Sequence, residues 1–130
     1  MNNGIVHFEI PGDDPEKLSQ FYTQLFDWKI EKLGEGDIEY WGITTTDSDE
    51  QGRPREPGAI NGGLARRMAP QQTTISYVNV DSVEQYVNTA KSLGATVVVE
   101  STPVPGMGRF AVLIDPQNNT FGLWQTDPSA

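Results

Sequence analysis

One histidine and one glutamate near the start of the chain have the types and spacing that acid–base chemistry needs. His7 and Glu9 alternate with the apolar residues Val6, Phe8 and Ile10. Alternate residues of a β-strand point to the same side, so His7 and Glu9 would share one face while the apolar residues pack beneath a helix. An imidazole beside a carboxylate can transfer protons or hydrogen-bond a ligand. The alternative is a structural strand histidine with a solvated carboxylate at a rim.

The composition excludes several other chemistries. The 130 residues include no cysteine, which rules out disulfides, cysteine-ligated zinc, iron–sulfur clusters and thiol nucleophiles. Eighteen acidic and nine basic residues give a net charge of −9, which opposes binding to nucleic acid and to anionic membranes. No apolar run is long enough to span a membrane, and no signal-peptide pattern is present. We therefore expect a cytoplasmic protein whose partner is a small molecule.

The elements that position His7 and Glu9 begin with a strand over Ile5–Ile10. A helix is expected from the N-cap Asp14 to Phe26, because Pro15 suits its first turn and its apolar residues recur at helical spacing. That apolar face consists of Leu18, Phe21, Tyr22, Leu25 and Phe26. Strands are expected next over Trp28–Leu33, Ile38–Thr44 and Ala59–Arg66, with a turn at residues 34–37 and a polar loop at 45–58. Arg66 and Arg67 are expected to be a solvated strand end.

The same pattern then occurs a second time. A strand over Thr74–Val80 leads to a helix that begins at the N-cap Asp81, with Glu84 at capping-box spacing, and ends at Gly94. Strands over Thr96–Ser101, Arg109–Ile114 and Thr120–Thr126 follow, with a loop at Pro103–Gly108. The segment Asn61–Arg66 is similar to Thr120–Gln125 at the matching place, which indicates an internal duplication.

The order β-α-β-β-β, read twice, predicts an α+β fold. We expect two such modules to form a curved, cup-shaped mixed sheet with the helices outside. The chain would be one domain over residues 1–130, with module 1 at about 1–68, module 2 at about 73–130 and a junction near Ala69–Thr73.

This duplication resembles the vicinal-oxygen-chelate superfamily of glyoxalases, bleomycin-resistance proteins and extradiol dioxygenases. The matching pieces cover nearly the whole chain, and they are Val6–Pro11 before Asp14-Pro15-Glu16, then Phe21-Tyr22, Phe26-Asp27-Trp28, Gly62-Gly63-Leu64, Tyr77–Asp81, Gly106–Ala111 and Asp115–Gln125. The chain looks closest to the small, single-domain glyoxalase-like proteins.

The resemblance implies four metal-ligand positions, which can be compared with the residues of this chain. Enzymes of the superfamily hold a divalent metal through four side chains, one from the first and one from the last strand of each module. His7 stands at the first of these positions, whereas the other three are Ile75, Gly63 and Gly122, which offer no donor atom. Glu9 adds one further ligand, and two ligands make a weak site. We therefore predict no cofactor and no metal bound in the family manner.

The resemblance and the strand alternation together predict one concave pocket. His7 and Glu9 are the candidate catalytic residues. The candidate ligand-binding residues are Asn61, Gly63, Tyr77, Asn79, Arg109, Gly122 and Trp124. The two glycines would form the floor and leave room for a ligand group, the alternative being that they permit close strand approach. Tyr77 and Trp124 could equally be core, and Arg109 an exposed strand-end residue.

Two classes of function follow. The first is a metal-free small-molecule-binding protein, like the antibiotic-sequestering members of the superfamily, and the missing ligands favour it. The second is a glyoxalase-like lyase, isomerase or dioxygenase that uses His7 and Glu9, metal-free or with an atypical divalent metal. Because small members of the superfamily commonly dimerise, we also expect a homodimer, with Trp41 and Met107 available for its interface.

Overall fold

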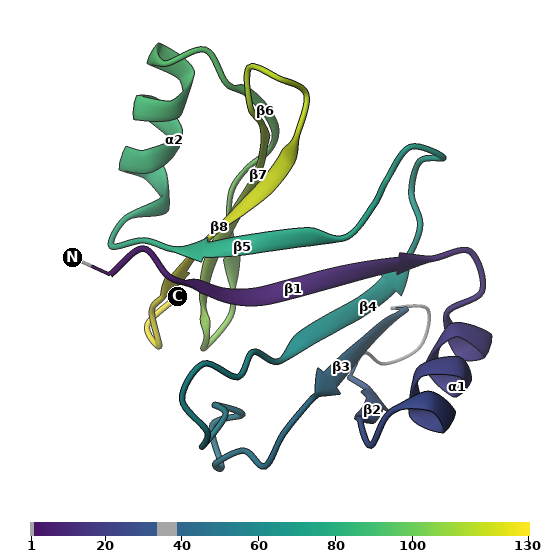
Figure 1. The fold of residues 1–130 in the computed structure, drawn as a ribbon. Coiled ribbons are helices and arrows are strands. Elements are labelled where there is room, and N and C mark those ends of the chain that lie inside the picture. The colour runs from purple at the N-terminus through teal and green to yellow at the C-terminus, as the bar shows by residue number, and fades with distance from the viewer. Residues whose placement is uncertain (1, 34–38) are drawn as a thin grey trace. The chain divides into compact units, whose positions relative to one another are not determined.

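The computed structural model describes residues 2–33 and 39–130, and its elements follow the order β-α-β-β-β twice (Figure 1). The elements are β1 (Ile5–Gly12), α1 (Pro15–Leu25), β2 (Lys29–Lys32), β3 (Tyr40–Thr44), β4 (Gly62–Arg66), β5 (Ile75–Asn79), α2 (Val83–Ser92), β6 (Thr96–Val104), β7 (Gly108–Ile114) and β8 (Thr120–Thr126). The predicted α+β class is confirmed. The turn predicted at residues 34–37 lies outside the described residues.

Two compact units divide the chain. The first unit is residues 7–74, and the second unit is residues 75–130 together with residues 1–6. Each unit contains four strands and one helix, apart from the first two residues of β1, which belong to the second unit.

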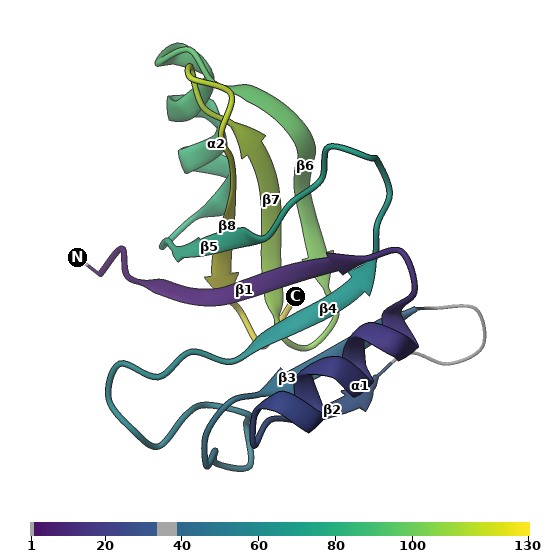
Figure 2. The same cartoon turned by 45° about the vertical axis from the view of Figure 1, so that its right-hand side comes forward.

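The first unit is a mixed sheet with α1 on one face. Its strands lie in the order β2-β3-β4-β1, where β3 is antiparallel to both neighbours and β1 is parallel to β4. Leu18 of α1 packs with Phe8 and Ile10 against buried side chains of β3 and β4, and Figure 2 shows the helix in front of this sheet. The predicted inward direction of Phe8 and Ile10 is therefore confirmed.

Helix α1 begins as its sequence predicts but buries less than expected. Asp14 is the N-cap and accepts a hydrogen bond from the Lys17 backbone N–H at 3.2 Å, with Pro15 in the first turn. Along the apolar face, however, Phe21 and Leu25 remain more than half exposed. Leu18 packs against the buried residues of β3 and β4, whereas Phe21 and Leu25 lie outside this cluster.

The second unit places α2 on a sheet with strand order β5-β8-β7-β6. Val83 and Val87 of α2 are buried against Ala111, Leu113 and Leu123. The N-cap is Ser82, whose side chain accepts a hydrogen bond from the Gln85 backbone N–H at 3.3 Å. The prediction of Asp81 as the cap is wrong by one residue, because the helix begins at Val83 and the capping oxygen must stand directly before it.

Strand β6 lies at the end of this sheet and is irregular. It pairs antiparallel with β7, with register shifts between Val97 and Val99 and between Val99 and Thr102. It continues through Pro103 to Val104, so the loop predicted from Pro103 onward begins later. Pro103 lies beyond these shifts, and an edge strand tolerates proline because one side of it has no neighbouring strand to receive a backbone hydrogen bond.

Two further sequence predictions differ from the structure. Val6 is 42% exposed, so it does not pack beneath a helix as Phe8 and Ile10 do. Trp41 is buried in the core of the first unit, with Lys32 Nζ 5.6 Å from its ring centroid, and so it is not available for a dimer interface. Met107 is exposed, as an interface residue would be.

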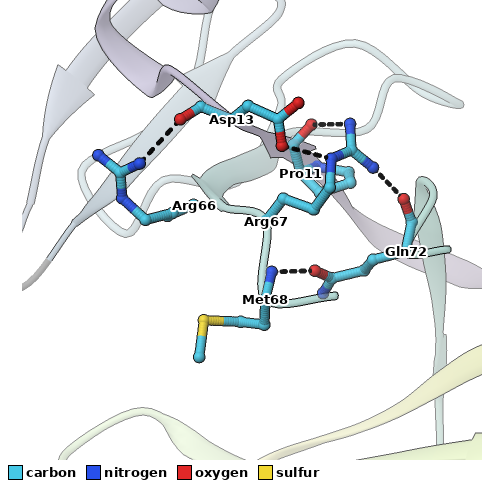
Figure 3. A network of polar contacts seen from close by, with 6 residues as sticks. All are labelled: Pro11, Asp13, Arg66, Arg67, Met68 and Gln72. Carbon is cyan, nitrogen blue, oxygen red and sulfur yellow. Dashed lines mark hydrogen bonds and ion pairs between the residues drawn. The ribbon is translucent and has the colours of Figure 1, made fainter. Parts of the chain in front are cut away.

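Arg66 and Arg67 hold the end of β4 by hydrogen bonds (Figure 3); Arg66 is exposed, as predicted, whereas Arg67 is partly buried. Arg67 Nε donates to Asp13 Oδ1 at 2.9 Å, and its guanidinium also binds the backbone carbonyl of Gln72. Arg66 pairs with Glu39 and donates to the Asp13 carbonyl at 2.8 Å. The hydrogen bond from Arg66 holds the pKa of Glu39 below its usual value. The two arginines therefore fasten the segment after β4 to the end of β1.

Among the described residues, no helix has the length and apolar character needed to cross a membrane.

Candidate functional site

His7 and Glu9 lie side by side on the face of the first unit's sheet opposite α1. His7 Nε2 stands 3.0 Å from Glu9 Oε2, and about a third of the His7 side chain and a quarter of the Glu9 side chain are exposed. Their neighbours in sequence, Phe8 and Ile10, point to the helix side. Strand alternation therefore brings the two side chains together, as the sequence predicts, and leaves both partly exposed.

Tyr40 of β3 completes this group. Its hydroxyl donates to Glu9 Oε2 at 2.6 Å and lies 3.4 Å from His7 Nε2. In the tautomer with hydrogen on Nε2, His7 donates to Glu9 Oε2. Glu9 Oε2 then accepts from both a tyrosine hydroxyl and an imidazole N–H.

Sequence reasoning missed Tyr40, although a signal was present. Trp41 and Ile43 are the inward residues of β3, so alternation alone sends Tyr40 to the face that carries Glu9. The contact is diagonal, because Tyr40 pairs directly with Ala65 and not with Gly63. A diagonal contact requires the strand register, which the sequence does not supply.

Gly63 makes the arrangement possible. It pairs with Glu9 on one side and with Gly42 on the other. A Cβ atom at position 63 would lie 2.0 Å from the Tyr40 hydroxyl oxygen and 2.9 Å from Glu9 Oε2. The space expected for a ligand group above this glycine is therefore filled by Tyr40.

Gly122 has the same relation to an aromatic residue in the second unit. It pairs with Tyr77, and a Cβ atom there would lie 2.3 Å from Tyr77 Cδ2. Tyr77 is buried in an apolar cluster with Ile75 and Val112, and Trp124 packs against this cluster. Here too an aromatic ring fills the place above the glycine. Both glycines thus support the alternative that they permit close packing.

The side-chain amide of Asn61 forms hydrogen bonds with the loop that precedes it. Its Oδ1 accepts from the Thr45 backbone N–H at 2.8 Å, and its Nδ2 donates to Ser48 Oγ at 2.8 Å and to the Gly52 carbonyl at 3.1 Å. These bonds hold the two ends and the middle of the long polar loop together. In the described conformation, Asn61 organises this loop.

Asn79, Arg109 and Trp124 also have partners within the second unit. The Asn79 side chain donates to the Asn2 carbonyl at 3.0 Å and so fastens the N-terminal segment. Arg109 Nε donates to Ser101 Oγ at 3.1 Å, and its guanidinium is 3.9 Å from Glu84. Trp124 Nε1 donates to Thr126 Oγ1 at 3.1 Å. The single pocket predicted to be lined by His7, Glu9, Asn61, Tyr77 and Trp124, with Gly63 and Gly122 at its floor, stays a prediction.

The donor atoms do not fit the four-ligand metal centre of the superfamily. Ile75 is buried and apolar, and Gly63 and Gly122 are covered by tyrosines. In the part of the chain that the structure describes, no three His, Cys, Asp or Glu side chains are grouped closely enough to hold a metal ion. His7 and Glu9 are thus two side chains that could each ligate a metal ion, and the group beside them is the Tyr40 hydroxyl.

Comparison with known proteins identifies relatives of the whole fold. Residues 7–124 match the family described as a glyoxalase-like domain. The chain is 26% identical over 132 residues to the anthracycline biosynthesis protein DnrV of Streptomyces peucetius, and 28% identical over 134 residues to DauV of Streptomyces sp. (strain C5). Each alignment covers 91% of this chain and 45% of the relative, so the chain spans a little under half of their length.

Solved structures show the same fold at low sequence identity. Methylmalonyl-CoA epimerase in complex with methylmalonyl-CoA and NH4+ matches over all of both chains, with a TM-score of 0.66 and 13% identity. The hypothetical protein BH1468 from Bacillus halodurans C-125 matches all of this chain and 99% of its own, with a TM-score of 0.64 and 15% identity. These similarities concern the fold alone.

Proposed function

Since the chain belongs to the glyoxalase-like domain family of the vicinal-oxygen-chelate superfamily, we propose that it binds a small organic molecule through His7, Glu9 and Tyr40. The observation that carries the proposal is the hydrogen-bonded group itself, in which two donors meet at Glu9 Oε2 on a sheet face that no helix of its unit covers. Convergent polar groups on a partly apolar surface are typical of small-molecule sites.

The relatives indicate which compounds to test first. DnrV and DauV are named for anthracycline biosynthesis, which makes polycyclic aromatic compounds one class of probe. Methylmalonyl-CoA epimerase was solved with a CoA ester, which gives acyl-CoA thioesters as a second class. Neither class is assigned by fold alone, because this fold supports several functions.

The test is a ligand screen with matched variants. Wild-type protein is screened by thermal shift against both classes, and each hit is measured by calorimetry with His7→Ala, Glu9→Gln and Tyr40→Phe. We expect each variant to weaken binding by about 1–3 kcal/mol, because each removes a hydrogen bond that involves a charged or polar partner in the site. Tyr22→Phe on α1 and Glu56→Gln in the polar loop are the controls, and both should bind like wild type.

The proposal fails if each hit binds the three site variants as tightly as it binds the wild-type protein and the two controls. Binding would then occur elsewhere on the protein. A screen without any hit in either class would also count against a small-molecule function at this face.

A second candidate function is proton transfer, as in a glyoxalase-like lyase or isomerase. The observation that favours it is the 3.0 Å separation of His7 Nε2 and Glu9 Oε2, which is hydrogen-bond distance for a proton relay. Incubation of the protein with methylmalonyl-CoA or another acidic carbonyl compound in D2O would reveal enzyme-dependent exchange of the acidic C–H by NMR. An enzyme should lose nearly all exchange in His7→Ala, whereas a binding protein should show no exchange in any form.

We include a homodimer in this proposal, because a second copy is the partner expected from the superfamily. The exposed Met107 supports an interface, whereas the buried Trp41 does not. Light scattering that finds only the 14.3 kDa species at micromolar concentration would contradict it. The cytoplasmic location stays a prediction.

A further inference from the structure

In the first module, the superfamily resemblance implies a metal-ligand position at Gly63. A side chain there would begin 2.0 Å from the Tyr40 hydroxyl oxygen. The hydroxyl group therefore occupies the volume that a ligand side chain would use. It donates to Glu9 Oε2 at 2.6 Å, where it supplies a positive hydrogen to the carboxylate.

We infer that Tyr40 positions Glu9 to accept a hydrogen bond from a protonated amine of a small organic ligand, at a site that works without a metal ion. This inference rests on the proposed function and names the chemical class of its ligand. Gly63 is part of the same arrangement of residues, because Tyr40 can reach Glu9 only where position 63 has no side chain.

The hydrogen bonds that the Glu9 carboxylate accepts favour a cationic ligand. Among the described residues, the contacts from His7 Nε2 and from the Tyr40 hydroxyl are both made at Oε2 of the carboxylate. The second oxygen, Oε1, is thereby left as an acceptor, and the side chain is a quarter exposed. A carboxylate forms its strongest hydrogen bonds with charged donors such as ammonium groups.

The charge of the chain favours the same class. Its net charge of −9 attracts cations and repels carboxylate or phosphate groups at long range. On the row of residues that includes Glu9, the register continues through Gly63 and Gly42 to Glu31, which is a further carboxylate, paired with Lys29. Gly63 thus lies directly beside Glu9 and Gly42 lies one strand further along, so neither of these two positions adds a positive charge next to the carboxylate.

The hydrogen bond from Tyr40 explains how the carboxylate keeps one orientation. A glutamate side chain on a strand has several rotamers, and holding one of them is a cost of binding. The bond of 2.6 Å fixes Oε2 and so directs Oε1 before a ligand arrives. Tyr40 then acts on the ligand through Glu9, as a positioning residue.

The experiment compares three probes that differ only in charge and donor type: benzylammonium, benzyl alcohol and benzoate. Each is titrated at millimolar concentration, and the backbone amide signals of β1, β3 and β4 are followed by NMR. We expect benzylammonium to bind at least about tenfold more tightly than benzyl alcohol, and benzoate to leave these signals unchanged. Glu9→Gln should remove the preference for the ammonium probe.

Tyr40→Phe and Gly63→Ala test the positioning role. Each should weaken benzylammonium binding by about three- to tenfold, and the double variant should be no weaker than the stronger single variant, because both act on one contact. Tyr22→Phe is the matched control and should bind like wild type. If Gly63→Ala does not fold, as judged by its amide spectrum, Tyr40→Phe still decides the question.

Several outcomes would overturn the inference. They are equal binding of ammonium and alcohol, binding of benzoate at these strands, an unchanged affinity in Tyr40→Phe, or no response to any probe. Stoichiometric binding of Ni²⁺ or Zn²⁺ that is lost in His7→Ala would also overturn it. If neutral probes bind here and depend on Glu9, the proposed function stands while the inference fails. If a broader ligand screen finds nothing at this face, both fail.

Discussion

The ring of Tyr77 lies over the backbone of Gly122, its direct partner on the neighbouring parallel strand, and leaves no room there for a methyl group. In the first unit the corresponding glycine, Gly63, is covered by Tyr40. The two modules thus use the same backbone device with tyrosines from different strands. In one module the hydroxyl binds a carboxylate, and in the other the ring joins an apolar cluster.

Gly122→Ala should therefore lower the free energy of unfolding by about 1–3 kcal/mol, the usual cost of overpacking. The new methyl group would stand 2.3 Å from Tyr77 Cδ2, and the ring is held by Ile75 and Val112. Urea denaturation measures the loss. In a Tyr77→Ala background the added cost should nearly vanish, and an equal cost in both backgrounds would show that the ring is not its cause.

Ser82→Ala should destabilise the protein by about 0.5–2 kcal/mol, because it removes the oxygen that caps α2. Asp81→Ala is the natural control, since Asp81 precedes the cap and should change stability by less than about 0.5 kcal/mol. Thermal unfolding of both variants by circular dichroism compares them. A larger loss in Asp81→Ala would place the cap where the sequence pattern predicted it.

Arg67→Ala should loosen the segment after β4, because it removes the bonds to Asp13 and to the Gln72 carbonyl. We expect a loss of about 1–3 kcal/mol in unfolding free energy, as for a partly buried charged hydrogen bond. Hydrogen exchange should also become faster at the Met68 amide, which donates to Gln72 Oε1 at 2.7 Å in the same segment. Arg55→Ala removes an exposed arginine that is 3.7 Å from Asp47, and it should have little effect. Unchanged exchange at Met68 in Arg67→Ala would contradict the role shown in Figure 3.

Asp115 should make the turn before β8 sensitive to acid. Hydrogen bonds from Asn119, backbone and side chain, and from the Gln117 backbone hold the pKa of Asp115 below its ordinary value of 3.8. Because the folded-state pKa is depressed, its stabilising effect is present above the ordinary pKa and is lost as pH falls through the folded value.

The corresponding measurement is urea denaturation at about pH 6 and about pH 3, since carboxylates titrate between these values. Asp115→Asn should lose less stability between the two pH values than wild type does. Asp47→Asn, in the exposed loop, should behave like wild type. An identical pH dependence in wild type and Asp115→Asn would refute the assignment.

Much of the fold could be predicted from short-range patterns. The alternation around His7 and Glu9, the proline after Asp14 and the glycine at position 94 each act within a few residues, so the sequence specifies them locally. Gly94 has φ of +105°, which is the left-handed conformation expected after a helix. The repeat of these local signals was enough to predict both modules.

The parts that could not be predicted depend on register and on competition between neighbours. Asp81 and Ser82 can both cap a helix, and only the first helical residue decides between them. Tyr40 meets Glu9 diagonally across β4, which needs the pairing of three strands. A glycine in a strand can leave room for a ligand or for a neighbouring ring, and its own identity does not distinguish these cases.

The irregular pairing of β6 has a consequence for the behaviour of the protein at high concentration. The three consecutive valines at 97–99 lie in the outermost strand of their sheet, and uncharged, β-branched segments of this kind are the ones that assemble into fibrils. Two register shifts interrupt the strand, Pro103 removes one backbone donor, and Glu100 adds a charge beside the valines. A second chain that approached this edge would not find a continuous row of partners, so the strand resists amyloid-like growth.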